Sequence, residues 1–181
     1  MNSRLICSFI GDDKHGLIEL LAKAISDCNG SWSESSMVRL SGQFAGLVKV
    51  AIDESNIESL RLACEDLANQ GLAIHIIPVH ETANSAANND EQSASQLQLN
   101  IIGNDRPGIV YEVSQALAAA KINVIKMKTH LSSAPMSGDS LFNSTMLLTN
   151  EYDHDLDALE KQLDKISERL SIEIDLESSD E

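Results

Sequence analysis

The sequence predicts an α+β protein built from two modules that repeat one order of elements: strand, helix, strand, strand, helix, strand. Three observations predict it. The chain has 181 residues, of which 43 % are apolar, enough for two small cores. Sliding the sequence against itself by 92 positions sets residues 5–16 over residues 97–108. Strand-like and helix-like apolar patterns then follow one another in the same order in each half.

In the first module, residues 4–10 are rich in strand formers and end at Gly11. Strands are predicted at 32–40 and 44–52 around the hairpin signal Ser41-Gly42, and the last strand covers 72–79. Two helices complete the module, because apolar residues recur at helical spacing: Leu17, Leu20, Leu21, Ala24, Ile25 and Cys28 in the first, and Ile57, Leu60, Cys64 and Leu67 in the second.

The second module repeats this order. In residues 97–101, apolar residues alternate with Gln98 and Asn100, which is typical of a strand with one face in water. Hairpin strands are predicted at 122–131 and 141–148, and the final strand at 172–176. The helix stripes are Ile109, Val113, Ala116, Leu117 and Ala120, and then Leu156, Leu159, Leu163, Ile166 and Leu170. We interpret the last stripe as core, with a docking surface as the alternative.

This order of elements builds a ferredoxin-like module, a four-stranded antiparallel sheet with two helices on one face. The predicted divisions are module 1 at 1–80, a linker at 81–95, module 2 at 96–177, and an acidic tail at 178–181. A module of roughly 80 residues buries too little surface to be stable with a margin, so pairing of modules or of two chains in a homodimer is expected. A sheet face left bare is the alternative.

Charge and composition exclude several classes of function. The formal charge is −15 and aromatic residues make up 3 %, so neither a phosphate-binding basic patch nor a base-stacking platform is expected, and direct nucleic-acid binding is excluded. The chain has no apolar run of about 20 residues and no leader at its N-terminus, which predicts no membrane contact and a cytoplasmic location. Cys7, Cys28 and Cys64 are expected to be buried free thiols.

Catalytic and metal-binding patterns are not found. The five histidines lack metal spacing, and no Gly-x-Ser-x-Gly sequence occurs. The sequence therefore predicts a protein that is not an enzyme and has no metal or cofactor.

The most informative segments are the turns from first strand to first helix, residues 11–16 and 103–108. Free N–H groups at a helix N-terminus favour a carboxylate or phosphate, and the first glycine of each turn lets backbone approach closely. Asp13 and Asp105 are predicted to cap the helices and to leave a lone pair for an ammonium group. The pair of features suits an amino-acid zwitterion. An ordinary strand-to-helix turn with an Asp cap has the same sequence pattern, so both interpretations stand.

The run Gly-Asn-Asp-Arg-Pro-Gly-Ile-Val at 103–110, followed by a helix and Ile122-Asn123-Val124, resembles the ACT domain of amino-acid-regulated proteins. The resemblance implies that the turn and the first residues of the second strand hold an effector amino acid between modules. It implies these ligand-binding residues: Gly103, Asn104, Asp105, Arg106, Pro107, Gly108 and Asn123 in module 2, and Gly11, Asp12, Asp13, His15, Gly16 and Ser31 in module 1.

Two such modules without an attached enzyme are similar to the glycine cleavage repressor family, as is the longer loop at 134–142. This resemblance implies a regulator that restrains a transcriptional activator protein of the glycine cleavage genes by protein contact. Glycine, or another small amino acid, would be the effector that relieves this restraint. The alternative is an ACT-type interaction or allosteric module with no amino-acid effector or a different one.

Overall fold

The computed structural model describes residues 2–79, 95–135, 137–150 and 156–178, which divide into two compact units, Met1–Ser85 and Ala86–Glu181. The predicted linker at 81–95 lies outside the described residues except for Ser95, where a strand begins. Of the predicted tail at 178–181, only Ser178 is described, as the end of a strand. The module boundaries therefore stay predictions.

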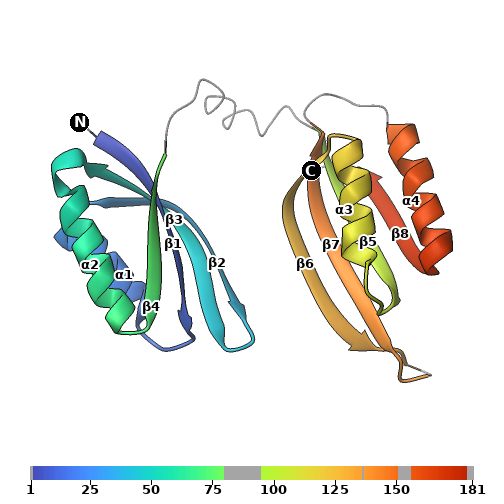
Figure 1. Ribbon diagram of the computed structural model, residues 1–181, viewed down its shortest axis with the longest axis horizontal. Helices are drawn as coiled ribbons and strands as arrows, with labels where there is room; N and C mark the ends of the chain where they lie inside the picture. Colours follow the sequence, from blue (N-terminus) through green and yellow to red (C-terminus); the bar gives the residue numbers. More distant parts are fainter. Residues whose placement is uncertain (1, 80–94, 136, 151–155, 179–181) are drawn as a thin grey trace. The chain divides into compact units, whose positions relative to one another are not determined.

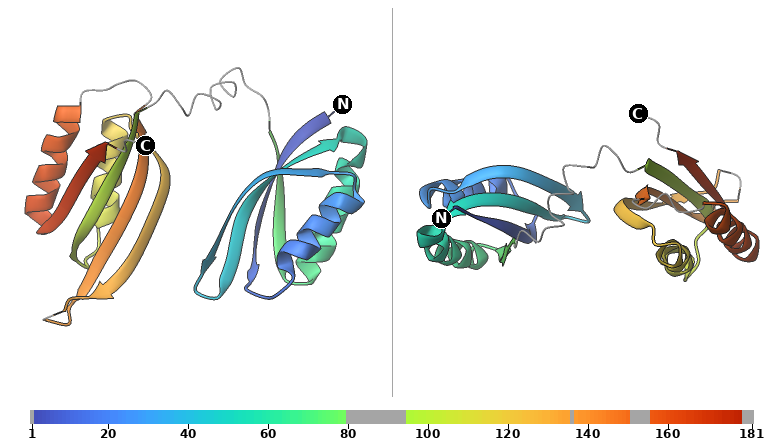
Figure 2. Two further views of the ribbon diagram at one scale, coloured as in Figure 1. Left: turned by 180° about the vertical axis from the view of Figure 1, so that it is seen from behind. Right: turned by 90° about the horizontal axis from the view of Figure 1, so that it is seen from above.

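Unit 1 contains a four-stranded antiparallel sheet with the strand order β2-β3-β1-β4. Both helices cover the same face of this sheet, as the views in Figure 1 and Figure 2 show. A short 3₁₀ turn, Glu54–Asn56, precedes the second helix. The elements are β1 (Asn2–Asp12), α1 (Leu17–Asp27), β2 (Ser31–Leu40), β3 (Gln43–Asp53), α2 (Ile57–Asn69) and β4 (Leu72–Pro78).

Unit 2 repeats this topology with the strand order β6-β7-β5-β8 (Figure 1). The predicted fold class, two α+β modules with ferredoxin-like topology, is confirmed. The elements are β5 (Ser95–Asn104), α3 (Ile109–Ala119), β6 (Asn123–Ser133), β7 (Ser140–Asn150), α4 (Leu156–Leu170) and β8 (Ile172–Ser178).

Each unit has its own apolar core between the sheet and its two helices. The predicted stripe of α4 is core, because four of its five residues are buried, and the docking alternative is wrong. The stripe predicted for α1 is wrong at Leu20, which is 37 % exposed. The buried positions of α1, Leu17, Leu21 and Ile25, follow one another at intervals of four, so Leu20 falls on the flank of the helix.

The sheet faces turned away from the helices are not covered within their units. In unit 1 this open face carries exposed apolar side chains, among them Val38, Leu40 and Leu47. In unit 2 it is mainly polar, with Ile102 and Leu147 among the polar side chains, and Gln98 and Asn100 lie on it as the alternation predicts. None of the helices in the described ranges is both long and apolar enough to cross a bilayer.

The three cysteines are free and buried in the unit 1 core, as the sequence predicts. Burial raises the pKa of the Cys7 thiol from 9.0 to about 11. Burial likewise raises the pKa of Cys64 to about 12. Removal of the thiols from water disfavours the charged thiolate, which is the form that reacts with electrophiles.

Because the folded-state pKa of Cys7 is raised, the stability contributed by this protonated thiol is fully present below pH 9 and is lost as pH rises towards about 11.

We also expect slow alkylation of the native protein by iodoacetamide at pH 8, and reaction at the rate of a free thiol once denaturant is added. Mass spectrometry of quenched samples counts the modified thiols. Labelling of the native protein as fast as the unfolded control would contradict the buried, protonated state.

Candidate functional site

The predicted ligand loops close in the same way in both units. In unit 1 the backbone N–H of Asp13 donates to the carbonyl oxygen of Gly42 at 2.8 Å. In unit 2 the N–H of Asp105 donates to the carbonyl oxygen of Ser140, also at 2.8 Å. Each loop is thus tied to the turn end of the hairpin formed by the second and third strands of its own unit. The repeat seen in the sequence therefore extends to the hydrogen bonding of these loops.

The first glycine of each loop is required by packing within the unit. A Cβ at Gly11 would lie 2.5 Å from the carbonyl oxygen of Gly71, and one at Gly103 would lie 2.4 Å from Cγ2 of Ile172. Both glycines pair with the first residue of the fourth strand of their unit, Leu72 or Ile172. The close approach that the sequence predicts is therefore an approach to the protein's own backbone and core, which explains these two glycines without a ligand.

The second glycine of each loop is the N-cap of the following helix. Gly16 has φ 90° and Gly108 has φ 102°, and no side chain caps either helix. The prediction that Asp13 and Asp105 cap the helices is wrong, because glycine in the left-handed conformation makes the turn into the helix at the cap position itself.

The start of each helix consequently presents backbone donors that no side-chain cap uses. The first bonds inside the helices are those from the N–H of Leu20 to the oxygen of Gly16 and from the N–H of Glu112 to the oxygen of Gly108. The N–H groups of the three residues before each of these donors have no partner within the helix. They lie at the positive end of the helix dipole, where a carboxylate is stabilised.

In unit 1 the acids of the loop are matched by donors of the same unit. Nε of Arg39 lies 2.8 Å from Oδ2 of Asp13. Asp12 accepts a hydrogen bond from Nε2 of Gln43 at 3.0 Å and lies 3.3 Å from Nζ of Lys14. The hydrogen bond from Gln43, followed by the interactions with Lys14, lowers the pKa of Asp12. The loop carboxylates of unit 1 are therefore already neutralised.

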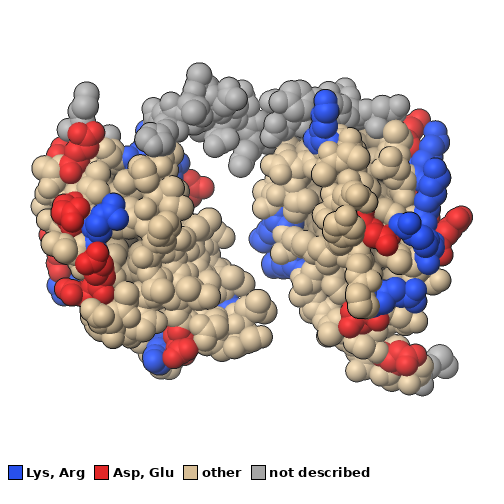
Figure 3. Space-filling view, in the orientation of Figure 1, with Lys and Arg blue, Asp and Glu red and all other residues tan. Residues whose placement is uncertain are grey.

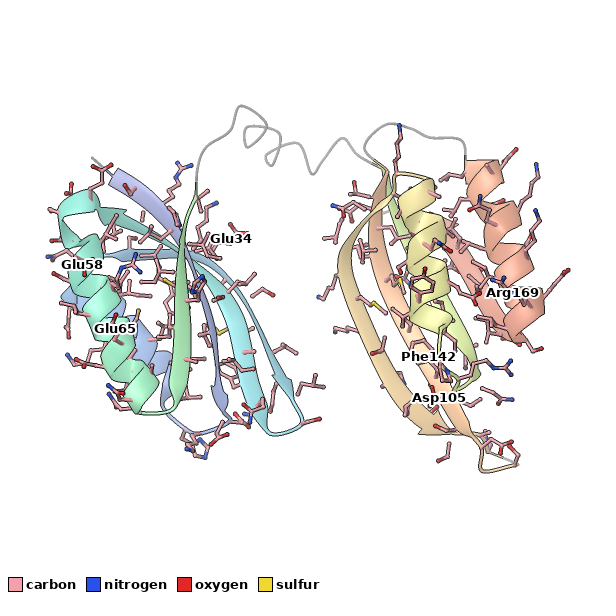
Figure 4. All side chains as sticks on the ribbon, in the orientation of Figure 1. Glu34, Glu58, Glu65, Asp105, Phe142 and Arg169 are labelled. Carbon is pink, nitrogen blue, oxygen red and sulfur yellow. The ribbon has the colours of Figure 1, made fainter. Side chains whose placement is uncertain are left out.

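In unit 2 the corresponding carboxylate has no partner among the described residues. Asn104, which is neutral, stands where unit 1 has Asp12, and Asp105 is exposed and has no ion pair among the described residues. Figure 4 shows Asp105 beside the end of α3 at which the helix begins. Arg106 and Pro107 are exposed in the same loop. Unit 2 thus presents a free carboxylate next to free helix N–H groups, the two groups that an amino-acid zwitterion requires.

Asn123 and Ser31 do not lie beside the loops of their own units. Asn123 pairs with Thr149 at one end of the unit 2 sheet, whereas Asn104, where the loop begins, pairs with Leu141 at the other end. Eight strand residues separate these ends, roughly 26 Å. Ser31 has the equivalent position in unit 1. Each unit therefore brings its own loop residues together, including His15 in unit 1. Neither unit brings the residue of its second strand, Ser31 or Asn123, to that loop.

Arg39, the partner of Asp13, is not predicted by the sequence pattern. Its proximity to the Ser41-Gly42 turn was the available signal, since a two-residue hairpin fixes which strand residues reach the loop.

A hollow of about 560 Å³ lies between α3 and α4, where Arg169 pairs with Glu112, and it was not predicted from the sequence either. None of the residues 103–108 lines this hollow, so it is separate from the loop.

Comparison with known families identifies the class of domain in unit 1. The family model of the ACT domain matches residues 3–76, which span β1 to β4. Unit 2 has the same topology. The chain is therefore a tandem of ACT-type modules in its fold, and the resemblance deduced from the sequence is confirmed at this level.

Two solved structures share this fold over nearly the whole chain. A protein described as unknown, from Galdieria sulphuraria, is 23 % identical; the match covers 99 % of this chain and 100 % of that one, with a TM-score of 0.82. A "putative glycine cleavage system transcriptional repressor" is 15 % identical; the match covers 100 % of this chain and 99 % of that one, with a TM-score of 0.70. No curated protein matches the chain.

The N-cap conformation gives a prediction for unit 2. A Cβ at Gly108 would touch nothing within 4 Å, so replacement costs only the energy of the φ of 102°. We expect Gly108→Ala to lower the free energy of unfolding by about 1–2 kcal/mol, and Gly108→Asn to lower it less, because Asn tolerates positive φ. Urea unfolding followed by circular dichroism measures both. Equal losses for Ala and Asn would contradict the assigned conformation.

Proposed function

We propose that this chain is an amino-acid-responsive regulatory protein in which the loop of unit 2, residues 103–108, binds the effector. The observation that carries the proposal is the free carboxylate of Asp105 beside the uncapped N-terminus of α3. The ammonium group of an amino acid would pair with Asp105, and its carboxylate would accept hydrogen bonds from the first N–H groups of α3. Arg106 and Asn104 would line the same loop.

Unit 1 would not hold an effector in the same way. The guanidinium of Arg39 already occupies the carboxylate of Asp13 at 2.8 Å, so an incoming ammonium group would have to displace a cation. The residues proposed from the resemblance in unit 1, namely Gly11, Asp12, Asp13, His15, Gly16 and Ser31, would therefore serve the fold and not the effector.

Glycine, or another amino acid with a small side chain, would be the effector. Glycine has five non-hydrogen atoms, and at about 1.5 kcal/mol per atom its binding cannot exceed roughly 7–8 kcal/mol, which corresponds to micromolar affinity at best. A site of this strength would fill and empty as the concentration of the metabolite changes. The second structural relative, described as a "putative glycine cleavage system transcriptional repressor", supports glycine over other amino acids.

The output of the sensor would be contact with a protein. A formal charge of −15 disfavours DNA as the direct target, because DNA binding rewards clusters of Lys and Arg. We infer that the chain restrains a transcriptional activator protein of glycine cleavage genes in the cytoplasm, and that it does so without catalysis. Binding of the effector would release that partner if the effector binds the partner-free form more tightly.

Thermal unfolding of the purified chain with each of the twenty amino acids tests the proposal. An effector at about 100 times its dissociation constant adds about 2.7 kcal/mol, which raises Tm by several degrees in a protein of this size. We expect a selective shift with glycine that Asp105→Asn abolishes and that Asp13→Asn, the matched change in unit 1, leaves in place. Far-ultraviolet circular dichroism at low temperature verifies that both variants are folded.

Each other outcome has a defined meaning. A shift retained by Asp105→Asn would place the effector elsewhere and refute the assigned site. Loss of the shift in Asn123→Ala as well would indicate that a second module completes the site, since Asn123 lies roughly 26 Å from the loop in its own unit. No shift with any amino acid would leave an interaction module without an amino-acid effector.

A further inference from the structure

The open face of the unit 2 sheet carries charges that are sorted by strand. On β8, Ile172, Ile174 and Leu176 pack in the core, so the alternate acidic residues project from the open face. On β6 the basic residues pair with open-face residues of β7. Figure 3 shows basic atoms over β6. The exposed side chains are Lys126, Lys128 and His130 on β6, and Glu173, Asp175 and Glu177 on β8.

Strand register arranges these residues in three rows across the sheet, each with a basic residue at one edge and an acid at the other. Polar and aliphatic side chains of β7 and β5 lie between them. The rows are His130–Asn143–Ile102–Glu173, Lys128–Thr145–Asn100–Asp175 and Lys126–Leu147–Gln98–Glu177.

The charges of a row cannot neutralise one another within the unit. β6 and β8 are the two edge strands, separated by three inter-strand spacings, or roughly 14 Å. None of the six residues forms an ion pair among the described residues. Unit 1 has no such rows on its open face, where Lys49 pairs instead with Glu34 on the neighbouring strand at 3.4 Å. A free amino acid, with its charges only a few ångströms apart, cannot bridge this separation.

We propose that this open face is a dimer interface that pairs with the same face of a second copy of the chain. A two-fold axis parallel to the strands, lying between the facing sheets, sets β6 of one copy over β8 of the other while each row stays opposite itself. Lys128 of one copy then meets Asp175 of the other, and Lys126 meets Glu177. A two-fold axis across the strands would set lysine over lysine. The charge pattern therefore selects one orientation.

The centre of the face is compatible with this pairing. Asn100 meets Thr145 of the second copy, so an amide and a hydroxyl group find polar partners at the middle of the interface, whereas Ile102 meets the side chain of Asn143. A hollow of about 360 Å³ on this face, lined by both edges and the centre, leaves room for side chains of the second copy. The face measures roughly 19 by 20 Å, or about 400 Å² on each copy, which is less than a stable specific interface buries, so the dimer is weak and reversible.

Charge-reversal variants of the full chain test the interface by sedimentation equilibrium. Lys126→Glu with Lys128→Glu makes both edges acidic, and Asp175→Lys with Glu177→Lys makes both edges basic. We expect each pair of substitutions to weaken self-association at least about tenfold, because the rim charges then repel. The quadruple variant exchanges the edges and should associate like the wild type. An equimolar mixture of the two double variants should form heterodimers.

The matched control is Lys161→Glu with Lys165→Glu on α4, which changes the net charge as much as the β6 variant but lies on the helix side of the unit. It should associate like the wild type, and added salt should weaken the wild-type dimer. A wild-type chain that is monomeric at about 0.5 mM overturns the proposal. So does a dimer that survives both reversals, or one that the quadruple variant does not restore. The effector site proposed above is independent of this result, since the thermal shifts are measured on either form.

Discussion

Each unit depends on the close packing at the end of its central strand. Gly11 is paired on one side with Phe44 and on the other with Leu72, and Gly103 has the equivalent place in unit 2. A Cβ atom at either glycine would lie 2.4–2.5 Å from Gly71 or Ile172, where the fourth strand begins. These distances are much shorter than a van der Waals contact. The chain must therefore pass this point as glycine and leave the sheet just beyond it. The exposed loop begins just beyond this glycine, and the left-handed Gly16 or Gly108 then starts the helix without a side-chain cap.

The elements were predictable because their signals are local. Alternation along β5 and the spacing of buried leucines in α4 need only neighbours in the sequence. The failures came where several parts of the chain compete for one role. The helix starts have glycine with φ near 90–100° at the cap position, where an Asp cap was predicted. Asp13 instead forms an ion pair with Arg39 of the neighbouring hairpin. Such a contact depends on register, which periodicity does not specify.

The functional set was predictable only in part for the same reason. Residues 103–108 are consecutive, so the sequence places them together at once. Asn123 was added by resemblance, and antiparallel topology puts it at the opposite end of the sheet. The charge rows of the unit 2 sheet could not be predicted from the sequence, because an irregularity between Val124 and Lys126 shifts the pairing of β6 with β7. Without that shift, the lysines would be assigned to the helix-facing side of the strand.

The two units share a fold but differ in how they use their charges. Exposed ion pairs add little stability, so this difference bears on binding more than on folding. In unit 2 the described ion pair is that of Arg169 with Glu112, and the lysines of β6 and α4 have no such partner among the described residues. In unit 1 the ion pairs among the described residues include Lys14–Asp12, Lys23–Asp27, Arg39–Asp13, Lys49–Glu34 and Arg61–Glu58.

This difference bears directly on how a duplicated loop can act as a sensor. Arg39 supplies to Asp13 the cation that an amino acid would supply to Asp105, so an effector at the unit 1 loop would compete with this ion pair. Under the proposed function, such a loop would gain less from an effector than a loop whose carboxylate is unpaired. In the unit 2 loop, Asp105 has no such cation among the described residues, so its exposed carboxylate is solvated. Binding energy can change a conformational equilibrium only where the free and bound states differ. Under the proposed function, a tandem with one loop paired internally would therefore concentrate the response to a weak, small ligand in the other unit.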